Sequence, residues 1–353
     1  MRGRNMSDMS LWPPEWPYAH GGPLAPGDFR MTPDDFIVEE VFDFVPEGQG
    51  EHLWLWIEKR GLTTPEAAKH VARVCGVRPR DVGYSGLKDR VAVTRQWLSV
   101  HLPGRDAPDA FATQLSDMGM VVHDARRHPR KLKRGVHRAN HFTLRLSGEI
   151  AAHPDLARRW RTLCADGVPN YFGPQRFGRE GRNLILAQKA FVRGWRKRDD
   201  PHGMQLSAAR SFLFNEVLAT RLRAQTWRTP RPGDVLALAG TASRFAADEI
   251  DVALHERAAR GDVTPTGPMW GRGRLESGAE VAEEETRLVA RHEALMQGLE
   301  AAGVRMDRRP LCVPLDAPSL AHEAPNRVTL GFGLPRGAFA TSVLRELLHH
   351  PLL

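Results

Sequence analysis

Hydrophobic and polar residues alternate in several short segments near both ends of the chain, which predicts β-strands there. FIVEEVFDFV at 36–45 and HLWLWIEKR at 52–60 predict two partner strands joined by the turn PEGQGE. Further strands are predicted from VAVTRQWLSV at 91–100, HFTLRL at 141–146 and VTLGFGLP, which follows residue 327. A sheet built from both ends of the sequence is therefore expected.

The middle of the chain has the spacing of helices. Thr63, Thr64, Pro65 and Glu66 predict a helix start with a hydroxyl cap, and that helix stops at Gly76. Longer helices are expected at 154–165, 181–195, 204–224, 248–259 and 281–301, and a last one is capped near Thr341. No alternation of strands with helices and no glycine-rich dinucleotide fingerprint is present, so the pattern predicts an α+β fold.

Composition narrows the function classes. Hydrophobic residues make up 41% of the 353 residues, enough for packed cores, while polar residues interrupt every apolar run. A membrane-spanning helix needs roughly 18 apolar residues in succession, so such a protein is excluded. The formal charge is +8, with 43 arginines and 7 lysines. Arginine suits phosphate and nucleobases, and the balance therefore favours a polyanionic partner.

Cysteines and the N-terminus indicate the compartment. Cys75, Cys164 and Cys312 are far apart and odd in number, so they form neither a disulfide framework nor a zinc knuckle. The Pro-, Gly- and Trp-rich residues 1–28 predict an irregular arm and lack the apolar core of a secretory signal. We expect a cytoplasmic protein.

Asp89 is the candidate reactive carboxylate. It follows Gly83 and Gly86 in DVGYSGLKDR, on a predicted loop between strands, where reacting groups are common. The neighbouring cations Lys88 and Arg90 would keep it ionised, and an ionised carboxylate acts as a nucleophile or a general base. The alternative is an ordinary turn aspartate that balances these charges. No second carboxylate lies in this segment and no histidine spacing indicates a metal site.

A basic tract at 126–138 is the clearest signal for a polyanion. It contains Arg130, Lys131, Lys133 and Arg134, and no acidic residue occurs between Asp124 and Glu149. Such a surface would bind a phosphate backbone in a salt-dependent manner. The alternative is a solvated loop without a partner.

Two segments contain residues that are able to contact bases. Asn140 and Phe142 lie on one face of the strand after the basic tract, and an amide reads a base edge while a ring stacks on a base. The alternatives are a loop-capping asparagine and a core phenylalanine. NYFGPQRFG at 170–178 combines aromatic rings with arginine, which suits either RNA contact or the joining of two structural parts.

Six segments taken together resemble one protein family. They occur in the order DDFIVEE, GYSGLKDRVAVTRQW, RANHF, NYFGPQRFG, ARSFLFNEVLATR and GAFATSVLREL. The chain closely resembles the TruD family of tRNA pseudouridine synthases over nearly its whole length.

The resemblance implies an isomerisation of uridine to pseudouridine in tRNA, characteristically at position 13, without cofactor or metal. The family's catalytic aspartate falls on Asp89, which either attacks the ribose or helps to form a glycal; the sequence leaves both routes open. By the same resemblance Phe36, Asn140 and Phe339 line the uridine pocket, and Phe142 is a further contact. Candidate backbone-binding or supporting residues are Arg30, Lys88, Arg90, Arg130, Lys131, Lys133 and Arg134.

The resemblance also implies the domain layout. Residues 29–167 and 315–353 would form the catalytic pseudouridine synthase domain, with a mixed, mostly antiparallel sheet, and 168–314 a more helical insertion domain. Three departures from the family pattern occur. Arg30 stands where lysine is expected, Ser85 stands where alanine is common, and the N-terminal arm through Trp16 is longer than expected.

Two other functions have to be weighed. A non-catalytic tRNA-binding protein or RNA chaperone would keep the basic surface, but it would not need the intact GLKDR. A nucleoside hydrolase would release free uracil, and paired acids or a metal cluster would have supported it. We expect a monomeric isomerase that acts on tRNA and needs no cofactor and no membrane.

Overall fold

The computed structural model describes residues 12–353, and its chain divides into two compact units. The sheet unit comprises Leu24–Cys164 and Leu315–Gly337. The described part of the helical unit comprises residues 12–23, Ala165–Pro314 and Ala338–Leu353. Each unit is therefore assembled from segments that lie far apart in the sequence. Residues 1–11 of the predicted arm lie outside the described residues.

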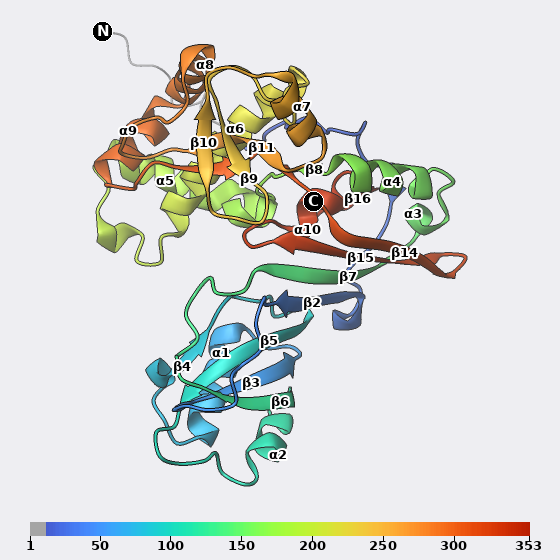
Figure 1. The fold of residues 1–353 in the computed structure, drawn as a ribbon, viewed down its shortest axis with the longest axis vertical. Coiled ribbons are helices and arrows are strands. Elements are labelled where there is room, and N and C mark those ends of the chain that lie inside the picture. The colour runs from blue at the N-terminus through green and yellow to red at the C-terminus, as the bar shows by residue number, and fades with distance from the viewer. Residues whose placement is uncertain (1–11) are drawn as a thin grey trace. The chain divides into compact units, whose positions relative to one another are not determined.

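One eight-stranded sheet forms the centre of the sheet unit (Figure 1). Seven strands follow the order β14-β15-β7-β2-β5-β3-β6, and β4 pairs with β5. Only the β2–β5 pair is parallel. The strands are β2 (Phe36–Val41), β3 (His52–Lys59), β4 (Val82–Tyr84), β5 (Val93–His101), β6 (Met120–His128), β7 (Ala139–Ser147), β14 (Asp316–Ala324) and β15 (Arg327–Pro335). The predicted mixed, mostly antiparallel sheet is confirmed.

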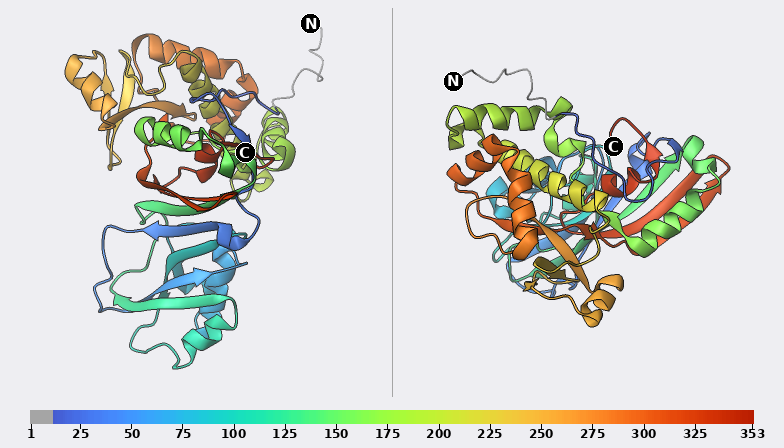
Figure 2. Two further views of the ribbon diagram at one scale, coloured as in Figure 1. Left: turned by 90° about the vertical axis from the view of Figure 1, so that its right-hand side faces the viewer. Right: turned by 90° about the horizontal axis from the view of Figure 1, so that it is seen from above.

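Helix α1 covers one face of this sheet (Figure 2). Its N-cap is Thr63, as predicted, whose hydroxyl accepts from the Glu66 amide while the Glu66 carboxylate returns to the cap. Leu55, Ile57 and Leu98 of the sheet pack against apolar residues of the helix in one buried core. The helices of this part of the chain are α1 (Thr64–Val74), α2 (Phe111–Ser116), α3 (Glu149–Ala152) and α4 (Leu156–Asp166), which crosses the unit boundary.

The helical unit is built around the long helix α6 (Met204–Arg223). Its buried side chains, Phe212 and Phe214 among them, share one core with Tyr171, Phe177 and residues of the neighbouring helices. The other helices are α5 (Arg182–Val192), α7 (Val252–Ala259), α8 (Ala279–Ala290), α9 (Glu293–Ala301) and α10 (Ala340–Leu344). A four-stranded sheet has the order β10-β9-β11-β12, with β9 (Asp234–Leu238), β10 (Arg244–Ala247), β11 (Val263–Met269) and β12 (Asp307–Pro310). The α+β fold with a more helical middle is thus confirmed.

Short elements complete the chain. They are the strands β1 (Ala25–Pro26), β8 (Val168–Pro169), β13 (Cys312–Val313) and β16 (Leu348–His349), and the 3-10 helices η2 (Pro33–Asp35), η3 (Pro79–Asp81), η4 (Pro174–Phe177), η5 (Arg179–Gly181) and η6 (Lys197–Asp199). Within residues 12–353, no helix is long and apolar enough to cross a membrane.

Three local predictions were wrong. Strands β2 and β3 are not partners, because β5 lies between them in the sheet. The single helix expected at 281–301 is two helices, separated at Arg291 and His292. The cap of the last helix is Phe339 and not Thr341, which lies inside α10. The predicted domain boundaries stay a prediction.

Candidate active site

Asp89 lies on the exposed loop between β4 and β5. Its side chain is 57% exposed, so a carboxylate oxygen is accessible to a large substrate. Arg30 Nη2 donates to Asp89 Oδ2 at 3.3 Å, while the Arg30 side chain is only 16% exposed. The cation that contacts this carboxylate therefore comes from a segment 59 residues earlier in the chain.

Arg30 also connects Asp89 to an aromatic ring. The Arg30 Cζ atom lies 4.5 Å from the centroid of the Phe36 ring, which favours a cation–π contact. Arg30 Nε is buried and has no acceptor within the described residues, so its hydrogen-bonding capacity is unused. Three of the predicted site residues, Asp89, Arg30 and Phe36, are brought together in the sheet unit.

Lys88 points to the opposite side of the loop from Asp89. Its Nζ donates to Glu40 Oε1 at 2.6 Å, and the two side chains are 6% and 0% exposed. Burial raises the pKa of the Glu40 carboxyl, and the Lys88 charge opposes this rise. The loop therefore buries the side chain of Lys88 while it exposes that of Asp89.

A second buried contact holds the start of the same loop. Ser85 Oγ lies 2.6 Å from His137 Nδ1 and accepts from the His137 backbone amide at 2.8 Å. Burial is the main reason that the pKa of His137 falls to about 4, which leaves the ring neutral at neutral pH. A side chain on Gly86 would lie within about 3 Å of Lys88 Nζ, Glu40 Oε1 and His137 Cε1. A side chain at this position of GLKDR would therefore have to displace the end of Lys88 from its contact with Glu40.

Lys59 is a supporting residue that sequence reasoning missed. This fully buried side chain donates from Nζ to the backbone carbonyl oxygens of Leu62, at 2.5 Å, and Asp89, at 3.1 Å. Desolvation lowers the pKa of Lys59 to about 8. Thr64 Oγ1 accepts from the Lys88 amide at 2.9 Å, which fixes the backbone one residue earlier. No motif marks Lys59, because its role is visible only when the end of β3 meets the loop.

Strand β7 places Asn140 and Phe142 on one face, as their spacing predicted. Asn140 is opposite Glu40 and Phe142 is opposite Val38 on β2. The Asn140 Oδ1 atom is buried and accepts no hydrogen bond from the described residues, so its acceptor capacity is unused. Phe142 is 7% exposed and its ring packs against Phe36 and Phe332, with centroids 6.2 and 5.6 Å away. This packing matches the alternative reading of Phe142 as a core residue.

The remaining basic candidates of the sheet unit differ in how they are held. Arg90 pairs with Glu66 and not with Asp89. Arg134 stacks on Tyr84, with its Cζ atom 4.0 Å from the ring centroid, and Lys131 Nζ donates to the Arg80 carbonyl oxygen. Arg130 and Lys133 are exposed, and within residues 12–353 neither of these two side chains forms an ion pair. Their charges face solvent.

Phe339 belongs to the helical unit. It is half-buried at the start of α10, and its ring centroid lies 5.8 Å from that of Phe172 in the NYFGPQRFG segment. Arg176 and Arg309 flank these two rings.

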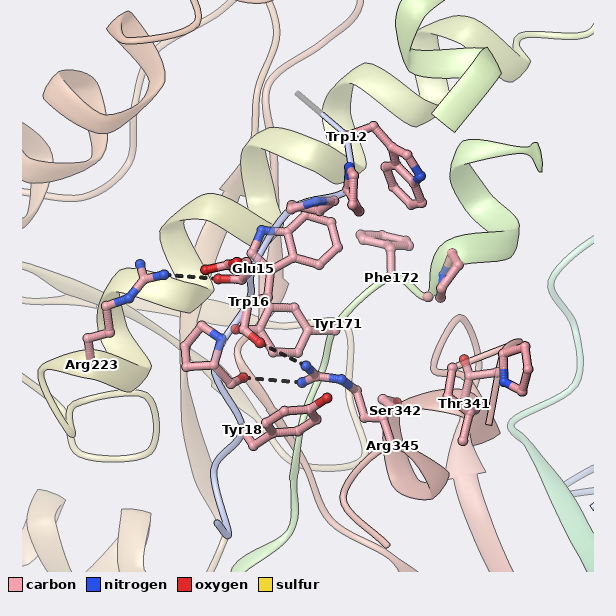
Figure 3. A pocket seen from close by; sticks show the side chains of 17 residues that line it. Trp12, Glu15, Trp16, Tyr18, Tyr171, Phe172, Arg223, Thr341, Ser342 and Arg345 are labelled. Atoms are coloured by element: carbon pink, nitrogen blue, oxygen red, sulfur yellow. Dashed lines mark hydrogen bonds between the residues drawn. The ribbon is translucent and has the colours of Figure 1, made fainter. Parts of the chain in front are cut away.

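The same unit contains a cavity of about 680 Å³ beside the N-terminal arm (Figure 3). Of the irregular arm predicted at 1–28, residues 12–23 contain no helix or strand, while Ala25 and Pro26 form the short strand β1. Trp16 of the arm stacks on Tyr171, and Arg345 donates to the backbone carbonyl oxygens of Trp16 and Pro17. The arm is thereby fixed within the helical unit.

An exposed carboxylate on a supported loop, next to an arginine and an aromatic ring, is an arrangement that suits an enzyme acting on a flipped nucleotide. The comparisons specify which one. The family model described as "tRNA pseudouridine synthase D (TruD)" matches residues 17–198 and 200–347. The chain belongs to this family.

Relatives agree with this assignment along the whole chain. The tRNA pseudouridine synthase D of Chromohalobacter salexigens is 74% identical over 348 residues, which are 99% of this chain and 100% of the relative. The protein of the same name from Pseudomonas aeruginosa is 44% identical over 94% of this chain and 93% of its own. A crystal structure of a putative tRNA pseudouridine synthase D from Methanosarcina mazei has the same fold, with a TM-score of 0.70 at 18% identity, and covers 94% of this chain and 95% of its own.

Proposed function

We propose that this protein isomerises uridine to pseudouridine in tRNA, that the target is uridine 13, and that Asp89 is the essential carboxylate. Membership of the family supports the reaction. The observation that carries the role of Asp89 is its position in GLKDR, exposed and in contact with Arg30. In this reaction the C1′–N1 bond breaks, the uracil turns, a C1′–C5 bond forms, the C5 proton leaves and N1 takes up a proton.

Each residue of the site has a part in this proposal. Asp89 drives cleavage of the glycosidic bond, either by attack on the ribose or through a glycal. Arg30 orients the carboxylate, and its buried Nε supplies a further donor to the flipped nucleotide. The amide of Asn140 accepts a hydrogen bond from uracil, and the rings of Phe36 and Phe339 line the pocket. Phe142 supports Phe36 from the sheet.

We further propose that Arg130, Lys131, Lys133 and Arg134 lie along the tRNA backbone, with Lys88 and Arg90 supporting the loop of Asp89. The enzyme works as a monomer in the cytoplasm, where its tRNA substrate is found, and the cysteines are free. The catalytic domain comprises 29–167 and 315–353, with an insertion domain at 168–314.

Release of tritium from tRNA labelled at C5 of uridine tests the reaction. Isomerisation releases the tritium to water while the uracil stays attached to the ribose. A hydrolase would instead yield free uracil, and an RNA chaperone would yield neither product. Mapping of the modified nucleotide by mass spectrometry then tests position 13. The proposal fails if a tRNA that binds the protein releases no tritium.

A further inference from the structure

Two arginines of the helical unit lie against the same pair of aromatic rings. The Arg309 Cζ atom is 4.1 Å from the Phe172 centroid and 6.0 Å from the Phe339 centroid. For Arg176 the corresponding distances are 5.2 and 5.5 Å. Arg176 and Phe339 are half-buried and therefore partly accessible to a ligand, whereas the Arg309 guanidinium lies deeper and Phe172 is buried.

The strand β12 explains why Arg309 points to these rings. The preceding residue, Arg308, points to the other face of the strand, where it is bound by Glu285 at 2.5 Å and by Thr266 at 2.7 Å. Arg309 points the opposite way and donates to the side-chain and backbone oxygens of Asn170. Arg308 thus ties the strand to the core through a buried ion pair, while its neighbour extends a cation toward the rings.

The contacts of Arg176 leave its charge available. Arg176 Nη1 donates to the neutral hydroxyl of Ser207 at 2.8 Å. Within residues 12–353 it takes part in no ion pair, unlike the buried Arg221, which pairs with Asp234 at 2.7 Å. A half-buried guanidinium without a counter-charge is a favourable place for an anion.

The electrostatics of the pair agree with this. Burial lowers the pKa of Arg176, and burial together with the charge of Arg176 lowers the pKa of Arg309 to about 9. Both groups remain protonated at neutral pH and repel each other. An anion bound between them would relieve this repulsion.

We propose that Arg176 and Arg309 bind a phosphodiester group of the RNA substrate next to the ring of Phe339. Guanidinium groups donate two parallel hydrogen bonds to phosphate oxygens, and an adjacent half-exposed ring suits a base. The inference rests on the proposed function, since it takes the substrate to be tRNA. It assigns an RNA-binding role to the arginine of NYFGPQRFG.

Salt-dependent tRNA binding tests the site. Affinity is measured by filter binding from about 0.05 to 0.3 M KCl for Arg176→Gln and Arg309→Gln, each combined with Asp89→Asn so that no turnover occurs. The loss of one phosphate contact reduces the slope of log Kd against log salt by about 0.7–0.9, and at 0.15 M salt the Kd rises by about three- to tenfold. Arg176→Lys restores the slope because it keeps the charge, but only part of the affinity because it lacks the fork.

Arg260→Gln is the matched control, since it removes the same charge from an exposed arginine that pairs with Asp262. It should keep the slope of the parent. Circular dichroism and a thermal melt verify folding. If Arg309→Gln is unfolded, Arg176→Gln decides, since it loses one hydroxyl hydrogen bond and its ring contacts but no ion pair. An unchanged slope for Arg176→Gln overturns the inference. Tritium release by the wild type, measured in parallel, reports on the proposed function alone, so the two failures are distinguishable.

Discussion

Adjacent residues of one loop form two very different ion pairs. Lys88 pairs with Glu40 at 2.6 Å, and both side chains are almost completely buried. Asp89 pairs with Arg30 at 3.3 Å, and its carboxylate is more than half exposed. Breaking the buried Lys88–Glu40 pair, here called the inner pair, costs much free energy because it leaves an unpaired buried charge. Breaking the exposed Arg30–Asp89 pair, the outer pair, costs little because water replaces the lost contact.

The two ion pairs therefore have different roles in the loop of Asp89. The inner pair fixes the backbone of the loop on its buried side. Lys59 and the Ser85–His137 contact contribute to this. The outer pair keeps a carboxylate oriented and yet accessible to a ribose. Preorganised catalysis requires a rigid loop, and it requires that the substrate is able to replace the contact made by the reacting group.

The largest effect on stability is expected from breaking the inner pair. Glu40→Gln leaves the Lys88 cation buried without a counter-charge, which should lower the free energy of unfolding by about 3–5 kcal/mol. The neighbouring Glu39 is 44% exposed and pairs with Arg95, so the control Glu39→Gln should cost less than about 1 kcal/mol. Urea denaturation measures both.

The double variant Glu40→Gln with Lys88→Met gives a further test. It removes both charges and should recover most of the lost stability, because an apolar side chain tolerates burial. Equal stabilities of the Glu39→Gln and Glu40→Gln variants would contradict the distinction between buried and exposed pairs.

Breaking the outer pair should affect the rate more than the fold. Arg30→Gln removes the cation that contacts Asp89, and we expect single-turnover tritium release to slow about fivefold, in line with an exposed ion pair of about 1 kcal/mol. Arg30→Lys keeps the charge and should remain within about twofold of the wild type, although it loses the stacking on Phe36. A Gln variant with the wild-type rate would show that Arg30 does not orient the carboxylate.

The smallest effect is expected on the pH dependence of stability, through the buried His137 next to the loop. The folded-state pKa of His137 is lowered to about 4 from 6.5, so between these values the unfolded chain binds a proton that the folded chain does not. Stability is therefore lost as the pH falls from 6.5 toward 4. His137→Asn should remove on the order of 1 kcal/mol of the difference between pH 7 and pH 5. Thermal melts of the wild type and of His137→Asn at the two pH values measure this difference. An equal change in stability between pH 7 and pH 5 for both proteins would argue against a neutral buried imidazole.

The sequence predicted helix caps, loops and strands correctly where the pattern of neighbouring side chains determines them. The hydroxyl cap of α1, the loop of Asp89 between two strands and the alternating strand at β7 were all predicted from neighbouring residues. Strand β14 was not predicted, because its residues are nearly all exposed and do not alternate; backbone pairing with β15 alone defines it. The interruption between α8 and α9 was also missed. There the ring of His292 packs against Phe212 at 5.0 Å, a contact that no local pattern reveals.

The candidate site was predictable only in part. Asp89 was predicted from GLKDR and from the family resemblance. The expectation that Lys88 and Arg90 are the cations beside this carboxylate was wrong. Lys88 points inward to Glu40, Arg90 pairs with Glu66, and Arg30 takes the position beside the carboxylate. Such contacts join residues from separate strands, and spacing along the chain carries no information about them.

The most direct test of the central claim compares two exposed aspartates. Asp89 and Asp34 each pair with one arginine and are 57% and 51% exposed, so Asp34→Asn is a close control for Asp89→Asn. The measurement is single-turnover tritium release from tRNA labelled at C5 of uridine. We predict that Asp89→Asn abolishes release while tRNA binding persists, and that Asp34→Asn releases tritium at nearly the wild-type rate. Undiminished release by Asp89→Asn would contradict the account.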